Sequence, residues 1–197
     1  MSVVLTKTYD APSVDKREVL RYAGCKGEDC QISALLDECI AEASGKLHYQ
    51  ARYCVLPCKI EGDCCEFTEF SVQSRHLALC LKGCQTAVLF CCSIGMEMDR
   101  LIAKYSRLSP TKGVLMQAFG AERIEALCDA FCEDIAKEYN GNARPRFSPG
   151  YGDLPLQTQK TIMQMLDLQK MGVGLNDSLL LSPSNTVPAF LGLAPTR

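Results

Sequence analysis

An apolar run of eight residues, 86–93, constrains the fold more than any other part of the sequence. It reads Thr-Ala-Val-Leu-Phe-Cys-Cys-Ser, and a run of this length and composition is typical of a strand that is buried in a sheet. Ile94 and Gly95 follow the run, and a helix is predicted at 96–105. The sequence therefore predicts a buried strand, a turn and a helix in direct succession.

Helical and strand-like patterns alternate irregularly on both sides of this unit. Further helices are predicted at 14–22, 32–47, 75–82, 156–171 and over a long region from Pro110 to Ile135, within which Gly120 can kink or divide the helix. Strands are predicted at 2–9, 49–56 and 65–72, with a hairpin turn at 61–63, and two short apolar pieces lie at 178–181 and 189–193. This mixture predicts a single α+β domain over residues 1–197, with a mainly antiparallel sheet and a helical lobe.

Charge and composition narrow the possible partners. The chain has 197 residues, of which 47% are hydrophobic and 22% charged, which is enough to bury a core. Its 21 basic and 23 acidic residues give a net charge of -2 without a basic tract, so nothing in the pattern favours nucleic acid or an anionic membrane. The first apolar residues are too few for a signal peptide, and no apolar stretch reaches about 18 residues. These features predict a cytoplasmic protein.

Thirteen cysteines give the sequence a second candidate chemistry. In a cytoplasmic chain they are expected to be reduced thiols, because disulfide frameworks belong to small secreted domains. The spacing Cys-x-x-Cys does not occur, so the usual zinc or iron–sulfur pattern is missing. Four cysteines form a candidate metal cluster across the predicted hairpin: Cys54, Cys58, Cys64 and Cys65. A cysteine-rich metal or redox protein is therefore an alternative function, although no single thiol is marked as a nucleophile.

The stretch from Arg146 to Lys160 is the part of the sequence whose residue order implies a ligand. Arg146 offers a planar guanidinium fork that matches a carboxylate. The adjacent Pro149 and Gly150 predict a type II turn with a positive φ at the glycine, which also lets the backbone approach a small molecule closely. This combination suits the head group of an amino acid.

The same stretch contains the pattern Arg-x-x-x-Gly-Tyr-x-x-x-Pro, formed by Arg146, Gly150, Tyr151 and Pro155. With this pattern the chain resembles the activation domain of cobalamin-dependent methionine synthase, which binds S-adenosylmethionine to remethylate an oxidised corrinoid. Two further positions agree with residues that methionine synthases often carry, Thr158 and Lys160. Segments 15–24, 90–105 and 121–138 resemble the corresponding parts of stand-alone members of the same family. The resemblance implies the curved α+β fold of that domain.

The resemblance also implies which residues bind S-adenosylmethionine. Arg146 would pair with the carboxylate of the methionine portion, and Ser148 would contribute its backbone rather than its hydroxyl. Gly150 and Tyr151 would flank the ligand in the turn. Asp129 falls at the position of a family glutamate that lies near the ligand.

Other acidic residues stay open as ligand partners. Glu133 lies one helical turn after Asp129 on the same face, so it is an equally reasonable partner for a ligand ammonium or hydroxyl. The family also uses an acidic residue near its N-terminus, for which Asp10 and Asp15 are both candidates. A tandem tyrosine that occurs late in full-length methionine synthases has no counterpart in this sequence.

A function follows from the resemblance as an expectation. The chain would bind S-adenosylmethionine and support the reductive methylation of a corrinoid protein in trans, with cobalamin on that corrinoid-binding partner or methyltransferase subunit and a flavodoxin- or ferredoxin-type reductant. No segment resembles the corrinoid-binding or homocysteine domain, so the chain is associated with methyl transfer but is not a complete methionine synthase. No catalytic acid or base is expected, because positioning is its contribution. A degenerate family member that serves only as a scaffold for partners is a further alternative.

Overall fold

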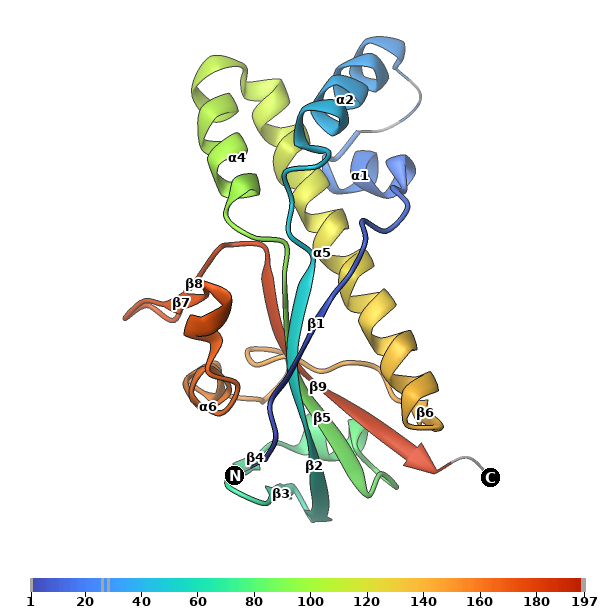
Figure 1. The fold of residues 1–197 in the computed structure, drawn as a ribbon, viewed down its shortest axis with the longest axis vertical. Helices are drawn as coiled ribbons and strands as arrows, with labels where there is room; N and C mark the ends of the chain where they lie inside the picture. The colour runs from blue at the N-terminus through green and yellow to red at the C-terminus, as the bar shows by residue number, and fades with distance from the viewer. Residues whose placement is uncertain (1, 26, 28, 196–197) are drawn as a thin grey trace.

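An antiparallel sheet runs through the molecule (Figure 1). The computed structural model describes residues 2–25, 27 and 29–195. Within these residues seven strands pair in the order β4-β3-β2-β5-β9-β6, with β1 beside β2, and every pairing is antiparallel, as the sequence predicts. The strands are β1 Leu5–Thr8, β2 Gln50–Glu61, β3 Cys64–Phe67, β4 Ser71–Gln73, β5 Thr86–Ser93, β6 Gly141–Ala143 and β9 Thr186–Pro195.

The predicted buried strand is β5, and it lies between β2 and β9 in the middle of the sheet. Successive side chains of a strand point to opposite faces. Val88 and Phe90 lie in the hydrophobic core on one face, whereas Leu89 and Cys91 lie in the core on the other. Because both faces of β5 are covered, its sequence is apolar throughout instead of alternating.

Four helices form the predicted lobe (Figure 1). They are α1 Lys16–Tyr22, α2 Cys30–Ala43, α4 Glu97–Leu108 and α5 Pro110–Glu138. The first half of α5 lies among the other three helices, and its second half runs along the sheet, where it contacts β5, β6 and β9. None of the helices in the described part of the chain has both the length and the apolar character needed to cross a membrane.

Gly120 does not divide α5, which is continuous through this position. The glycine instead leaves room for its neighbours. A Cβ atom here would lie 2.8 Å from Cγ of Met98 and 2.9 Å from Oδ1 of Asn185. Such contacts are too short for a packed interior. Gly120 therefore lets α4 and the segment before β9 lie directly against α5.

Shorter elements cover the other face of the sheet. They are α3 Arg75–Cys80, α6 Thr158–Met165, the 3-10 helix η1 Leu168–Met171, and the hairpin of β7 Gly174–Leu175 and β8 Leu181–Ser182. The predicted helix at 156–171 is divided, because Asp167 adopts a left-handed conformation with φ of 47° between α6 and η1. The predicted strand at 65–72 is also divided, since a turn that joins Phe67 to Phe70 separates β3 from β4.

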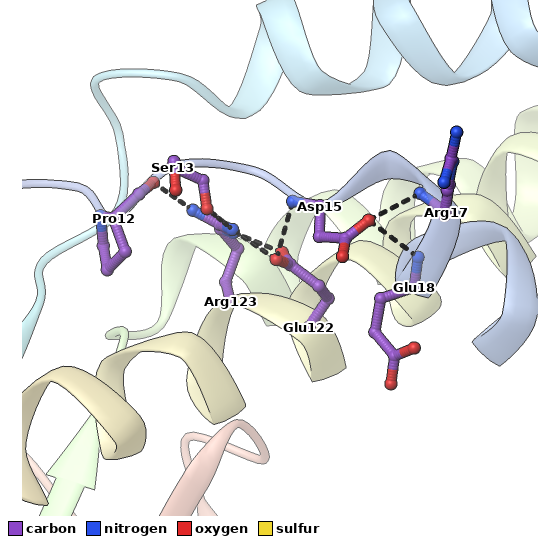
Figure 2. A network of polar contacts seen from close by, with 7 residues as sticks. All are labelled: Pro12, Ser13, Asp15, Arg17, Glu18, Glu122 and Arg123. Atoms are coloured by element: carbon purple, nitrogen blue, oxygen red, sulfur yellow. Dashed lines mark hydrogen bonds and ion pairs between the residues drawn. The ribbon is translucent and has the colours of Figure 1, made fainter.

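A buried ion pair holds the segment before α1 against α5 (Figure 2). The side chain of Arg123 is 0% exposed and that of Glu122 is 5% exposed. Arg123 donates to Glu122 and to the backbone oxygens of Pro12 and Ser13, and Glu122 accepts the backbone N–H of Asp15 at 3.0 Å. The Asp15 side chain accepts the first free backbone N–H groups of α1. Glu122 and Arg123, called the buried pair below, thus fix where α1 begins.

Candidate ligand-binding site

The loop that carries Arg146 is attached to β9 by backbone hydrogen bonds. Arg144 N–H donates to the Gly192 oxygen at 2.8 Å, and Phe147 and Phe190 exchange two bonds of 2.9 Å each. Phe147 packs against the core on the α6 face of the sheet. Because side chains alternate along an extended segment, Arg146 projects the other way, toward α5.

A tight turn follows at 148–151. The Tyr151 N–H donates to the Ser148 oxygen at 3.2 Å, which closes the turn over Pro149 and Gly150. Gly150 has φ of 89°, so the positive φ predicted from the Pro-Gly pair is confirmed. Arg146, Ser148 and Tyr151 line one cavity, so the turn places two of its residues beside the guanidinium.

Arg146 pairs with two carboxylates that stand one turn apart on α5, Glu125 and Asp129. The exposed fractions of the side chains are 24% for Arg146, 44% for Glu125 and 65% for Asp129. Burial acts to lower the pKa of Arg146, but the hydrogen bond to Asp129 and the charge of Glu125 outweigh it and raise that pKa above its usual range. The guanidinium is therefore always charged, and its partners are half-exposed side chains.

A cavity of about 560 Å³ opens beside this ion pair. Its lining includes Glu125, Arg146, Ser148, Tyr151 and Gln159, and we call it the arginine cavity. The volume lies within the range of roughly 300–1,000 Å³ that is typical of small-molecule sites. A guanidinium, a carboxylate and an amide therefore converge on a space large enough for a ligand.

Gln159 is incompletely hydrogen-bonded. The residue is 8% exposed, and its Oε1 atom is buried without a hydrogen-bond partner among the described residues. Leaving a buried acceptor unpaired costs roughly 1–3 kcal/mol. A ligand that donates a hydrogen bond through an ammonium or hydroxyl group would satisfy this oxygen.

The five predicted site residues differ in how they are placed relative to the arginine cavity. Arg146, Ser148 and Tyr151 line it, and Gly150 shapes the turn between the last two. Tyr151 is 69% exposed, which excludes a role as a core aromatic. Asp129 does not line the cavity, but it forms an ion pair with Arg146, which does.

The other acidic candidates lie elsewhere. Glu133 and Asp10 are exposed on the surface, and Asp15 caps α1. Sequence reasoning missed Glu125, although it precedes Asp129 by the same helical spacing at which Glu133 follows it. It also missed the burial of Gln159, for which the sequence carries no signal.

Asp153 fastens the far end of the loop to α3. It accepts hydrogen bonds from Ser74 Oγ at 2.5 Å and from the backbone N–H groups of Arg75 at 2.9 Å and His76 at 3.2 Å. The Ser74 bond, helped by the backbone donors, lowers the pKa of Asp153 to about 2. The carboxylate is therefore ionised at neutral pH and holds the loop in place.

Within the described part of the chain, the cysteines form no cluster with the ligand count of a metal site. All thirteen are free thiols. Burial raises the pKa of Cys54 and Cys58 to about 11 and that of Cys65 to about 12, so these thiols are protonated and unreactive at neutral pH. Among the described residues, which include Cys64, no group of three or more His, Cys, Asp or Glu side chains could hold a metal ion.

Comparisons with known proteins identify the fold. The sequence matches no protein-family model and no curated protein. Among solved structures, the crystal structure of the MetH reactivation domain bound to AdoHcy is similar, with a TM-score of 0.71, 14% sequence identity, and coverage of 100% of this chain and 80% of that chain. The α+β fold with an antiparallel sheet is thus shared with the MetH reactivation domain, which confirms the predicted fold class.

Proposed function

We propose that this protein binds S-adenosylmethionine in the arginine cavity and supports the reductive methylation of a corrinoid protein in trans. The observation that carries the proposal is the ion pair of Arg146 with Glu125 and Asp129 at the margin of that cavity. A second support is the shared fold with a domain whose crystal structure contains AdoHcy. The motif of Arg146, Gly150 and Tyr151 is a third.

The head group of an amino acid carries both charges that this ion pair contains. The ligand carboxylate would take the guanidinium of Arg146 from Asp129, whose side chain is 65% exposed and can turn into water. The ligand ammonium would lie against Glu125 and donate to the unpaired Oε1 of Gln159. Each charge inside the cavity then has an opposite partner, and the exposed carboxylate of Asp129 is hydrated, so no uncompensated charge is buried.

The chemistry itself belongs to bound groups. When bound, S-adenosylmethionine supplies a sulfonium methyl group, which a cobalt centre on the partner accepts after reduction by a flavodoxin- or ferredoxin-type donor. The residues of this chain hold the head group in a fixed orientation, since Asp153 and β9 anchor both ends of the loop. No proton transfer by the protein is required.

Calorimetric titration with S-adenosylhomocysteine, the product of the transfer, tests the ligand. Arg146→Ala is expected to weaken binding at least about tenfold, because a charge-assisted hydrogen bond worth about 1.5–3 kcal/mol is lost. Arg144→Ala is the matched control, since Arg144 lies in the same loop but donates to the backbone oxygen of Lys82. If wild type does not bind at millimolar ligand, the proposed function fails and the alternative of a scaffold for partners remains. If Arg146→Ala binds as tightly as wild type, the role of Arg146 is refuted.

A second assay tests methyl transfer. The protein is mixed with S-adenosylmethionine, cobalamin and reduced flavodoxin, and the products are separated by chromatography. Methylcobalamin and S-adenosylhomocysteine are expected in equal amounts and faster than without protein. If S-adenosylmethionine stays intact while it binds normally, the chain is a ligand-binding module without this transfer activity.

A further inference from the structure

Two thiols contact the ligand loop where it leaves β6. The Cys80 Sγ atom, at the end of α3, donates to the Pro145 oxygen at 3.0 Å. The Cys84 Sγ atom meets the Arg144 side chain over β9, since a Cβ atom on Gly192 would lie 2.8 Å from that sulfur and 3.3 Å from Cγ of the arginine. The two thiols therefore touch consecutive residues of the loop.

These two thiols lie near each other because the chain turns back between them. Gly83 has φ of 80°, a conformation that favours glycine, and the Cys84 N–H donates to the Leu81 oxygen at 3.0 Å. Burial raises the pKa of Cys80, and the charge of Cys84 adds to this effect. Cys80 is half-buried and Cys84 is 7% exposed, so a reagent in solution reaches Cys80 first.

Cys58 is a third thiol in this region, but it faces another direction. Its Sγ atom donates to the backbone oxygen of Cys84 at 3.5 Å. Cys58 belongs to β2, whereas the Cys84 sulfur lies over β9, and β5 separates these two strands. Burial raises the pKa of Cys58 to about 11, which keeps this thiol protonated at neutral pH. Cys80 is thus the thiol best placed to pair with Cys84.

The guanidinium of Arg144 favours the ionised form of both thiols. Burial raises the pKa of Cys80 and of Cys84, but Arg144 acts in the opposite direction, through its charge on Cys80 and through a hydrogen bond on Cys84. The thiolate is the form that attacks a disulfide sulfur. Arg144 is itself held in place, since it donates to the Lys82 oxygen at 3.2 Å. The reactive form of each thiol therefore arises beside a fixed cation.

We propose that Cys80 and Cys84 form a reversible disulfide by exchange with a low-molecular-weight disulfide such as oxidised glutathione. The Cys80 thiolate attacks one sulfur of glutathione disulfide and releases one glutathione thiolate. The Cys84 thiolate then attacks the Cys80 sulfur of the mixed disulfide and releases the second. Two protein thiols are oxidised, one glutathione disulfide is reduced to two glutathione molecules, and the two protons pass to the released thiolates.

Closure of this disulfide removes a support of the ligand loop. A disulfide sulfur carries no hydrogen, so the Pro145 oxygen loses its donor, and Pro145 lines the arginine cavity directly before Arg146. The reduced protein therefore holds Arg146 more firmly than the oxidised protein. This effect on the ligand rests on the proposed function, whereas the disulfide itself does not. Because the proposed reaction needs a reductant, the loop is firm under the conditions in which that reaction runs.

Peptide mapping tests the disulfide without any ligand. The protein is equilibrated with mixtures of reduced and oxidised glutathione, free thiols are alkylated, and linked peptides are identified by mass spectrometry. We expect a link between Cys80 and Cys84 that dithiothreitol reverses and that forms faster at about pH 9 than at about pH 7. Cys25→Ser is the matched control, because Cys25 is also half-buried but follows α1 in the helical lobe. A link between Cys58 and Cys84, a mixed disulfide that stays on Cys80, or no link at all would overturn the proposal.

Two substitutions of Cys80 test the effect on the ligand by calorimetry with S-adenosylhomocysteine. Cys80→Ser keeps a hydroxyl donor for the Pro145 oxygen but cannot form the link, so it should bind like reduced wild type with or without oxidised glutathione. Cys80→Ala lacks the donor and should bind about threefold more weakly, as oxidised wild type does. If the link forms and both redox states bind equally, the loop effect is wrong and the proposed function stands. If the link forms and neither state binds, the proposed function fails and the disulfide stands.

Discussion

Two clusters of arginine and carboxylate lie along α5, and they differ in what the guanidinium contacts. In the buried pair, Arg123 donates to Glu122 and to two backbone oxygens, and both side chains are 5% exposed or less. In the second, which we call the open cluster, Arg146 donates to the half-exposed side chains of Glu125 and Asp129. The same chemical pair is enclosed by protein in one place and borders a cavity in the other.

The difference teaches which ion pairs a ligand can replace. Backbone oxygens cannot leave without unfolding the segment they belong to, and a buried carboxylate left alone loses its compensation. Exposed carboxylates can rotate into water, and an exposed ion pair is worth only about 0–1 kcal/mol. The buried pair therefore positions α1, whereas the open cluster is suited to exchange its partners with a charged ligand.

The largest expected effect is the loss of stability when the buried pair is broken. Arg123→Met leaves Glu122 buried without its counter-charge and should lower the free energy of unfolding by about 3–5 kcal/mol. Urea unfolding measures this change. Arg146→Met is the matched substitution in the open cluster and should cost less than about 1 kcal/mol. Equal losses in the two variants would show that the two clusters do not differ as described.

A double substitution sharpens the same comparison. Glu122→Leu combined with Arg123→Met removes both charges and should recover part of the loss caused by Arg123→Met alone, because no isolated charge remains buried. The backbone oxygens of Pro12 and Ser13 still lose a donor, so recovery should be incomplete. A double variant less stable than the single one would contradict this account.

The next largest effect is expected in ligand affinity, when the carboxylate proposed to hold the ligand ammonium is neutralised. Glu125→Gln should weaken S-adenosylhomocysteine about tenfold, or about 1.4 kcal/mol, since the carboxylate that lines the arginine cavity loses its charge. Calorimetric titration measures the change. Methylthioadenosine lacks the amino-acid head group, so its affinity should stay the same in this variant. An equal loss for both ligands would place Glu125 away from the ammonium.

Some of these features could be predicted from the sequence, and others could not. The apolar run of β5 and the Pro-Gly turn at Gly150 are local patterns, and both are confirmed because local chemistry determines them. The sequence identified the arginine of the motif and Asp129 but not the second partner, Glu125, since α5 carries several acidic residues and packing decides which of them meet Arg146. The place of α1 depends on contacts between α5 and a segment far away in sequence, which no local pattern encodes.

A substitution at Asp129 is expected to change the ligand affinity less than Glu125→Gln does, and in the opposite direction. In the free protein its carboxylate occupies Arg146, so Asp129→Asn removes a competitor of the ligand carboxylate. The affinity for S-adenosylhomocysteine should rise about two- to fivefold, in line with the worth of an exposed ion pair. Weaker binding would instead indicate that Asp129 itself contributes to holding the ligand, since the family resemblance implies a position near it. Glu133→Gln, also exposed on α5, is the control.

Asp153 combines features of both clusters. The smallest of the expected effects is a change in thermal stability on its substitution. Its side chain is 43% exposed, as in the open cluster, but it accepts backbone N–H groups that cannot move away. Its pKa in the folded protein is about 2, below the usual value of 3.8, so the stability it contributes is present above about pH 4 and is lost as the pH falls through 2. Asp153→Asn should therefore unfold at a lower temperature than wild type above pH 4, and the two melting temperatures should converge toward pH 2. A difference that stays constant over this range would mean that the Asp153 charge does not hold the loop.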